Sequence, residues 1–328
     1  AMDAAGVYED AMLVMLGAAR LGGVKSMDQR DREFIDAWEV EQYRRAVSSG
    51  KGVAGRLDGK IAVVTGAAQG FGQGIAEHLA AEGAHVVLAD LNQDKGVEVA
   101  QTICWSSGAF RASFEQVDVT DPESLRQMMK GIVATYGGID LVVSNAGILR
   151  AGSVKTQPAA EFRAFTEVNY MGFFNVVQAV AGVLATQNQA APGRWADIVQ
   201  INSKSGLEGS NRNGAYAGSR FGSIGLVQSF AKELVEDRIK VNAICPGNFF
   251  DGPLWSDPEN GLFAQYLRTG KVPGAETIED VKRAYESKVP MGRGCEVKDV
   301  VHAILYLVEQ EYETGQALPV TGGQVMLH

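Results

Sequence analysis

The amino-acid sequence predicts an α/β fold: a doubly wound parallel sheet flanked by helices, with a helical extension at the N-terminus. Two observations support this prediction. From Leu57 onward, short β-rich runs alternate with helical stretches, which is the pattern of repeated strand–helix–strand units. The β-rich runs are also almost continuously apolar, as expected of strands that helices cover on both faces of a sheet. Because such crossovers are right-handed, a doubly wound sheet is the simplest topology.

The sequence divides into an N-terminal part, residues 1–55, and a single domain, residues 56–328. We expect two helices and a linker in the first part, because Phe34, Ile35 and Trp38 share one helix face and Ser48–Gly52 is typical of a linker. In the domain, strands are predicted in order at residues 61–65, 85–90, 139–145, 196–202, 239–244 and 316–320. The stretches between them are predicted to be helices that cover the sheet.

Composition excludes several classes of function. The formal net charge of -9 argues against a nucleic-acid partner, because proteins that bind nucleic acids usually have a basic face. Three widely spaced cysteines predict neither a disulfide framework nor a zinc site, and four scattered histidines lack the spacing of metal ligands. No apolar run approaches the roughly 18 residues of a membrane helix, and the first residues lack a secretion signal. We therefore expect a cytoplasmic protein with no metal, nucleic-acid or membrane partner.

A glycine-rich loop joins the first predicted strand to the helix that follows it. Its glycines permit a tight turn and let backbone N–H groups approach a pyrophosphate at the positive end of that helix. The loop residues predicted to bind a dinucleotide are Gly66, Gln69, Gly70, Phe71 and Gly72. The next strand ends at Asp90, whose carboxylate can bind ribose hydroxyls and repel a 2'-phosphate, so the predicted cofactor is NAD. Asp118, with Val119 beside it, is a further candidate, although this segment is equally a helix start.

Three residues suggest catalysis at a carbonyl or alcohol carbon. Tyr216 lies four residues before Arg220 in a helical stretch, so the two share a helix face. A tyrosine can act as a general acid or base if a fixed cation helps to stabilise its ionised form. Ser203, thirteen residues earlier, can donate a hydrogen bond to the substrate oxygen as charge develops there.

The ordered set of motifs resembles the short-chain dehydrogenase/reductase family, which has a Rossmann-like domain, over roughly residues 57–328. The matching motifs are Thr65–Gly72, Asn145-Ala146-Gly147, Asn169, Ser203, Tyr216 and Pro246-Gly247. The resemblance implies that Tyr216 is the acid/base, that Ser203 orients the substrate oxygen and that Asn169 supports a water in the proton relay. It also implies a homotetramer and cofactor contacts from Asn145, Ala146, Gly147, Tyr216, Arg220, Pro246 and Gly247. The family has lysine at the position of Arg220, whose planar guanidinium keeps the charge but has a different shape.

Within that family, three segments resemble the sorbitol-6-phosphate 2-dehydrogenases: residues 198–206 with Ser210 and Asn213 beyond them, residues 288–295 and residues 320–327. This resemblance implies a phosphorylated polyol as substrate. Residues 248–290 are predicted to form a substrate lid, because ligands of such sheets bind beyond the carboxyl ends of the strands. The predicted substrate contacts are Lys204, Asn248, Phe249 and Trp255, with Lys204 the candidate for the phosphate because it directly follows Ser203.

Two other hypotheses fit the same sequence. The chain could be a non-catalytic NAD-binding protein that has lost turnover through Arg220. The same features also resemble the dehydrogenase half of fused aldolase/dehydrogenase proteins, and residues 31–45 resemble their connecting segment. On that hypothesis, the chain is the dehydrogenase fragment of a bifunctional protein.

Overall fold

The computed structural model describes residues 55–326 except 109, 151, 269 and 271. The chain divides between Gly55 and Arg56, close to the predicted boundary, and the structure discussed below is that of the second unit. The two helices predicted in residues 1–55 fall outside the described residues and stay a prediction.

A seven-stranded, all-parallel sheet forms the centre of the described domain, which confirms the predicted fold class. The strands are β1 (Ile61–Thr65), β2 (His85–Asp90), β3 (Ala112–Gln116), β4 (Leu141–Ser144), β5 (Ala196–Ile201), β6 (Ile239–Pro246) and β7 (Ala317–Val320). Their order in the sheet is β3-β2-β1-β4-β5-β6-β7. The chain therefore winds outward in both directions from β1 and β4, and the switch between these two strands is where such sheets bind ligands.

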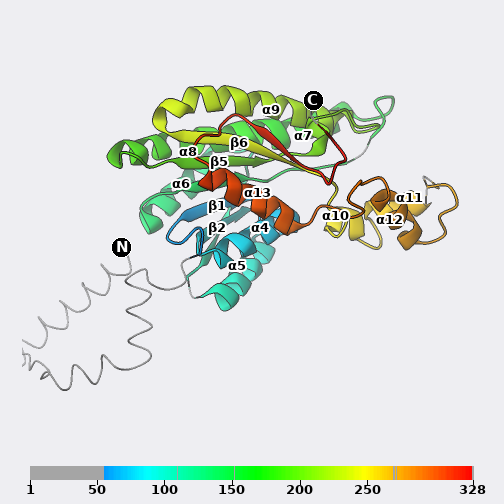
Figure 1. Ribbon diagram of the computed structural model, residues 1–328, viewed down its shortest axis with the longest axis horizontal. Coiled ribbons are helices and arrows are strands. Elements are labelled where there is room, and N and C mark those ends of the chain that lie inside the picture. Colours follow the sequence, from blue (N-terminus) through cyan, green and yellow to red (C-terminus); the bar gives the residue numbers. More distant parts are fainter. Residues whose placement is uncertain (1–54, 109, 151, 269, 271, 327–328) are drawn as a thin grey trace, which may run out of the picture. The chain divides into compact units, whose positions relative to one another are not determined.

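Helices cover both faces of the sheet, as the apolar strands require (Figure 1). One face packs against α4 (Gly70–Ala81), α5 (Gln93–Ser107) and α13 (Val297–Glu309), with Ile75, Ile103 and Ile304 in its core. The other face packs against α6 (Pro122–Tyr136), α8 (Gly172–Ala190) and α9 (Gly214–Leu234). Two fully developed cores, one on each face, hold the carboxyl ends of the strands in a fixed arrangement.

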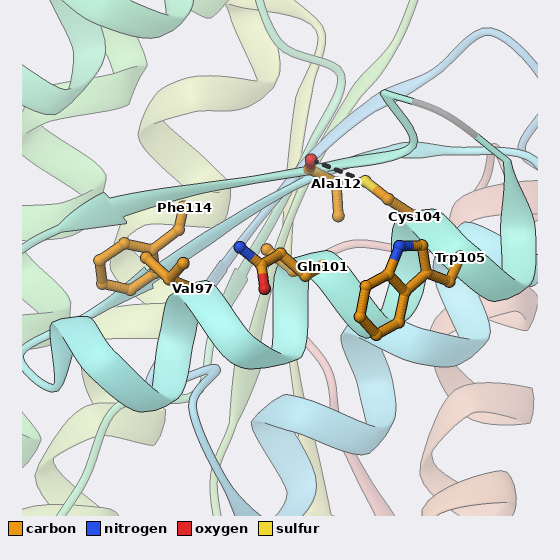
Figure 2. A pocket seen from close by; sticks show the side chains of 7 residues that line it. Val97, Gln101, Cys104, Trp105, Ala112 and Phe114 are labelled. Carbon is orange, nitrogen blue, oxygen red and sulfur yellow. Dashed lines mark hydrogen bonds between the residues drawn. The ribbon is translucent and has the colours of Figure 1, made fainter.

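Strand β3 was missing from the strands that the sequence predicts. Its sequence, ASFEQ, lies at the edge of the sheet and most of it is only half-buried, so it lacks an apolar run. The ring of Phe114 packs against α5 at Gly96, where a Cβ atom would come within 2.0 Å of the ring. A groove of about 300 Å³ lies between α5 and β3, lined in part by Trp105 and Cys104 (Figure 2). None of the predicted site residues lines this groove.

A long helical stretch corrects the expectation about apolar runs. Residues Ala159–Ala190, which comprise α7 (Ala159–Phe165), the π-helical turn η1 (Thr166–Met171) and α8, are long and apolar enough to cross a bilayer by length and composition. The expectation that no such segment exists is therefore wrong. Phe173, Val177 and Leu184 on this stretch are buried in the core beneath the sheet, which accounts for its apolar composition.

The segment predicted to be the lid has a hydrophobic core of its own. It contains α10 (Pro253–Ser256), α11 (Leu262–Arg268) and α12 (Ile278–Glu286), which lie together at one end of the sheet (Figure 1). The indole of Trp255 packs against Phe250, Phe263 and Tyr285, at ring-centroid distances of 5.0, 5.1 and 5.2 Å. The aromatic side chains of the segment thus hold its short helices together.

Candidate active site

The predicted site residues converge on the carboxyl edge of the sheet, around the switch between β1 and β4. Asn145 ties the first two loops of this edge together: its side-chain amide donates to the carbonyl oxygens of Thr65 and Gly66, both at 3.0 Å. Glycine is required where the loops meet. A Cβ atom on Gly66 would lie 2.8 Å from the Cα atom of Ala146, and one on Gly72 would lie 2.0 Å from the carbonyl oxygen of Gly66. The motif 145–147 therefore has a packing role in addition to its predicted cofactor contacts.

The start of α4 is suited to an anion. Its N-cap residue, Gln69, makes no side-chain hydrogen bond to the helix, and the first turn has no acidic residue. Gly70 adopts a φ of +60°, and a Cβ atom there would meet no described residue within 4 Å, so the space beside it is open within this part of the chain. Backbone N–H groups at a helix start in such open space are the usual donors to a pyrophosphate. These residues fit a dinucleotide.

Asp90 ends β2 beside this loop, as predicted. Its carboxylate accepts hydrogen bonds from the backbone N–H of Ala68 at 3.0 Å and of Asn92 at 2.9 Å, which fixes its orientation next to the glycine-rich loop. Asp118 hydrogen-bonds within its own turn: one carboxylate oxygen accepts from both the backbone N–H and the hydroxyl of Thr120, at 2.8 and 2.7 Å. The next residue, Val119, is buried. Of the two acids, Asp90 is the one held against the loop.

Ser203 follows β5 and caps the short 3-10 turn η2 (Lys204–Gly206). Its hydroxyl oxygen accepts a hydrogen bond from the backbone N–H of Ser205 at 3.1 Å. Because this bond uses only a lone pair, the hydroxyl hydrogen remains able to donate to a substrate oxygen. Lys204 lies directly beside it and is half-buried.

Tyr216 and Arg220 lie one turn apart on α9, as predicted. The guanidinium lies over the phenol ring, with its central carbon 5.1 Å from the ring centroid, and Nη1 donates to the Ile201 carbonyl oxygen at 3.2 Å. Arg220 is only 5% exposed, yet its Nε finds no hydrogen-bond partner among the described residues. Burying a cation whose N–H donor has no acceptor costs free energy unless a ligand accepts that hydrogen bond. Hydroxyl groups of a cofactor ribose would be suitable acceptors.

The guanidinium of Arg220 occupies the space that a side chain at Gly147 would need. A Cβ atom at this position would lie 2.4 Å from Nη2 of Arg220 and 3.1 Å from Oδ1 of Asn169. The longer side chain that replaces the family lysine therefore fits only because residue 147 has no side chain.

Asn169 lies in the π-helical turn η1 and is 1% exposed. Its Oδ1 accepts from the backbone N–H of Ile148 at 2.8 Å, and its Nδ2 donates to the Ile148 carbonyl at 3.0 Å and to the Ser219 hydroxyl at 3.3 Å. The main-chain carbonyl of Asn169 accepts from Ser223 at 3.3 Å. The amide thus joins the loop after β4 to α9. Its predicted part in a water relay stays a prediction.

Asn202 was not among the candidates from the sequence, yet it contacts three parts of the site. It is 4% exposed, and its Oδ1 accepts from the backbone N–H of Ser203 at 2.8 Å. Its Nδ2 donates to the Arg220 carbonyl at 3.1 Å and to Oε1 of Gln200 at 2.9 Å. No local sequence signal marks such a residue, because its contact on α9 is 18 positions away.

The last strand of the site, β6, leads through Pro246 into Gly247 and Asn248. The backbone N–H of Gly247 donates to Val320 at 2.9 Å, and a Cβ atom here would lie 2.8 Å from the Gln324 side chain. Asn248 accepts a bond from the backbone N–H of Cys295 at 2.8 Å. These contacts fix the entrance to the lid.

Cys245 and Cys295 lie next to this region, but their thiols are not suited to act as nucleophiles. Burial raises the pKa of the Cys245 thiol to about 12, although the nearby Ser203 backbone and the Arg220 charge act in the opposite direction. Burial likewise raises the pKa of Cys295 to about 12. Both thiols therefore stay protonated near neutral pH, and the reactive nucleophile in proteins is the thiolate.

The predicted substrate residues fall into two groups. Lys204 and Asn248 lie at the ends of β5 and β6, close in sequence to Ser203 and Gly247. Phe249 stacks on Phe71 of the glycine-rich loop, with ring centroids 4.3 Å apart and an interplanar angle of 19°. Trp255 is buried in the aromatic core of the lid, at 8% exposure, so its indole supports the lid from within.

Comparison with known proteins agrees with this geometry. Residues 60–255 match the family described as short chain dehydrogenase. The chain belongs to the short-chain dehydrogenase/reductase family. Sorbitol-6-phosphate 2-dehydrogenase from Escherichia coli (strain K12) is 34% identical over 270 residues, which covers 81% of this chain and 99% of that protein. A crystal structure of sorbitol-6-phosphate 2-dehydrogenase from Erwinia amylovora matches with a TM-score of 0.74 at 35% identity, and covers 81% of this chain and 100% of that one.

Other members of the family are similar to nearly the same degree. The 3-oxoacyl-[acyl-carrier-protein] reductase of Thermotoga maritima is 32% identical over 276 residues, with 83% of this chain and 100% of that protein covered. The chain is accordingly an alcohol/ketone oxidoreductase of a family that typically uses NAD or NADP. Identity alone does not separate a polyol phosphate from other substrates, because the two relatives differ by only two percentage points.

Proposed function

We propose that this protein is an NAD-dependent dehydrogenase that interconverts a secondary alcohol of a sugar-alcohol phosphate with the corresponding ketone, as in sorbitol 6-phosphate and fructose 6-phosphate. The observation that supports it most is the convergence of three groups at one edge of the sheet. These groups are the Ser203 hydroxyl, the Tyr216–Arg220 pair, and the glycine-rich loop that ends against Asn145.

Each residue has a distinct task in the oxidation. A nicotinamide dinucleotide, when bound, supplies the acceptor for the hydride that leaves the alcohol carbon. Tyr216 accepts the hydroxyl proton of the substrate as general base, and returns one as general acid in the reverse direction. Ser203 donates a hydrogen bond to the substrate oxygen, which favours the charge that develops there. The guanidinium of Arg220, over the phenol ring, stabilises the ionised tyrosine, and its Nε, which no described residue accepts from, can donate to a ribose hydroxyl.

The preference for NAD is proposed from Asp90. Its carboxylate is held beside the glycine-rich loop by the backbone of Ala68 and Asn92, where a ribose 2'-hydroxyl can donate to it and a 2'-phosphate would be repelled. We expect Asp90→Ser to narrow the ratio of kcat/KM for NAD over NADP. A ratio equal to that of the wild type would show that another group sets the preference.

The phosphate of the substrate is assigned to Lys204. This lysine directly follows Ser203 and is half-buried, so its ammonium can reach a phosphate on a substrate whose reacting oxygen lies at the serine. The names of two relatives agree with this class of substrate. We also propose that the protein works as a homotetramer in the cytoplasm, as the family resemblance and the composition led us to expect.

The test compares initial rates of NADH formation with sorbitol 6-phosphate and with unphosphorylated sorbitol, for the wild type, Lys204→Ala and Arg212→Ala. Arg212 is an exposed cation a few residues away and serves as the matched control. The proposal predicts that the wild type prefers the phosphorylated substrate, and that only Lys204→Ala removes this preference. Equal rates on both substrates in the wild type would refute the phosphate assignment while leaving the oxidoreductase intact.

A further inference from the structure

Asn202 occupies the point where the serine loop and the tyrosine helix meet. Its side chain is almost fully buried and makes one bond in each direction: it accepts from the Ser203 backbone at 2.8 Å and donates to the Arg220 carbonyl at 3.1 Å. Its own backbone N–H donates to Ile244 of β6 at 2.7 Å. A single planar amide therefore spans the segments that hold the proposed hydrogen-bond donor and the proposed acid/base.

The Asn202 side chain is closely packed, and its hydrogen-bond partners require both a donor and an acceptor. A Cβ atom on Gly206 would lie 2.3 Å from Oδ1 of Asn202 and 3.1 Å from the Arg220 carbonyl, so the η2 turn closes directly over the junction. Gln200 fixes the orientation of the amide, because its Oε1 accepts the second Nδ2 hydrogen at 2.9 Å. Only a side chain with both an acceptor and a donor in one plane can serve both partners here.

We infer that Asn202 is a positioning residue that sets the distance between the Ser203 hydroxyl and the Tyr216–Arg220 pair. The inference rests on the proposed function, because the distance matters only if these residues handle the substrate. Catalytic groups must be held to well under 1 Å of their productive geometry, and a misplacement of about 1 Å can cost about a hundredfold in rate. Asn202 has no direct contact with substrate in this assignment and acts only through its two neighbours.

Two variants separate the two bonds. Asn202→Leu has a similar shape and removes both bonds together with the bond to Gln200. Asn202→Asp keeps the acceptor for Ser203 and replaces the donor to Arg220 and Gln200 by an oxygen that repels the Arg220 carbonyl. Asn242 provides matched controls, since it is equally buried, accepts from the backbone of Gln316 and donates to the carbonyl of Glu313, both at 3.0 Å, in the turn before β7. We would make Asn242→Leu and Asn242→Asp beside the other pair.

The measurements are kcat and KM for a secondary alcohol substrate, the NAD dissociation constant from protein fluorescence, and thermal unfolding. We expect the Asn202 variants to lower kcat by about a hundredfold with little change in NAD affinity. The KM for the alcohol should change much less than kcat, because Asn202 has no direct contact with the substrate in this assignment. The Asn242 variants should unfold at lower temperature, with kcat of the folded enzyme unchanged.

Wild-type kcat in both Asn202 variants, or a rise in KM as large as the fall in kcat, would overturn the inference. An equal loss of kcat in the Asn202 and Asn242 variants would also overturn the inference, because replacing any buried asparagine would then lower kcat. If Asn202→Leu does not fold, Asn202→Asp decides alone. A wild-type protein that binds NAD without oxidising any alcohol would be a failure of the proposed function, which this design distinguishes from a failure of the positioning role.

Discussion

Gly147→Ala should disable the enzyme through Arg220. The added Cβ atom would lie 2.4 Å from Nη2 of the guanidinium, its closest contact, and 3.1 Å from Oδ1 of Asn169. The backbone of Gly147 is not in the left-handed region, so the backbone itself accepts an alanine. A carbon and a nitrogen in van der Waals contact stay about 3.5 Å apart, so the guanidinium must move by about 1 Å. It has little freedom to do so, because it is 5% exposed and lies over the Tyr216 ring.

The size of the effect follows from this displacement. A shift of about 1 Å in a catalytic group costs about a hundredfold in rate, which corresponds to about 2.7 kcal/mol in the activation free energy. The free energy of unfolding should change much less, since the close contacts involve only the ends of the Arg220 and Asn169 side chains. Gly225→Ala is the matched control on α9: a Cβ atom there meets none of the described atoms within 4 Å, so this variant should gain about 0.5 to 1 kcal/mol of stability and keep wild-type kcat.

The assay is a double-mutant cycle on kcat with Gly147→Ala and Arg220→Lys. A lysine has no Nη2 atom, so the added methyl group should cost about tenfold or less in the lysine background, against about a hundredfold in the arginine background. If Gly147→Ala retained wild-type kcat, or cost as much beside lysine as beside arginine, the reasoning about the guanidinium would be refuted.

Three further predictions concern the fold and the lid. Lys240→Met should lose about 3 to 5 kcal/mol of unfolding free energy in urea at pH 7, because it strands the buried carboxylate of Asp197, 3.0 Å from the ammonium. Burial raises the pKa of Asp197 to about 6 from 3.8, so its folded form binds the proton more tightly and its contribution to stability falls as pH rises through that window. Without the lysine this pH window extends upward, so the loss of unfolding free energy in Lys240→Met should be smaller at pH 5 than at pH 7. A loss at pH 5 as large as that at pH 7 would contradict the role given to Lys240. Phe249→Ala removes the ring stack on Phe71, worth about 0.5 to 1.5 kcal/mol, and should speed limited proteolysis within residues 251–290; an unchanged cleavage rate would count against the stack as a latch. Thr277→Ala removes the capping box of α12, at a cost of about 1 kcal/mol, and should accelerate amide exchange in that helix alone, so exchange at the wild-type rate would show the cap to be unimportant.

The sequence predicted those parts of the fold whose pattern is local. Strands buried on both faces read as apolar runs, and the glycine-rich loop between β1 and α4 has a fixed order of residues, so both were found. Strand β3 was missed because an edge strand is exposed on one side and tolerates Ser113 and Glu115. The helix over residues 159–190 was missed as an apolar stretch because its polar residues interrupt any continuous run, while its average hydropathy stays high.

The sequence predicted the residues to which chemistry is assigned by proposal, and it missed the residue that holds them together. Ser203, Tyr216 and Arg220 share one neighbourhood, as their spacing on a strand end and a helix face suggested. Asn202 gave no signal, since its value depends on a carbonyl that only the fold brings near. Trp255 looked like a substrate contact because aromatic residues in a lid often are, yet its indole is buried among other rings.

Whether the protein turns over a secondary alcohol decides if it is the proposed enzyme. We would follow NADH formation by the purified protein with sorbitol 6-phosphate, beside Tyr216→Phe and Arg220→Lys. We expect measurable turnover in the wild type, retention of turnover in Arg220→Lys and its loss in Tyr216→Phe, with NAD still bound by all three. A wild type that binds NAD but never forms NADH, while Arg220→Lys does, would contradict this expectation and make this a cofactor-binding protein disabled at one residue.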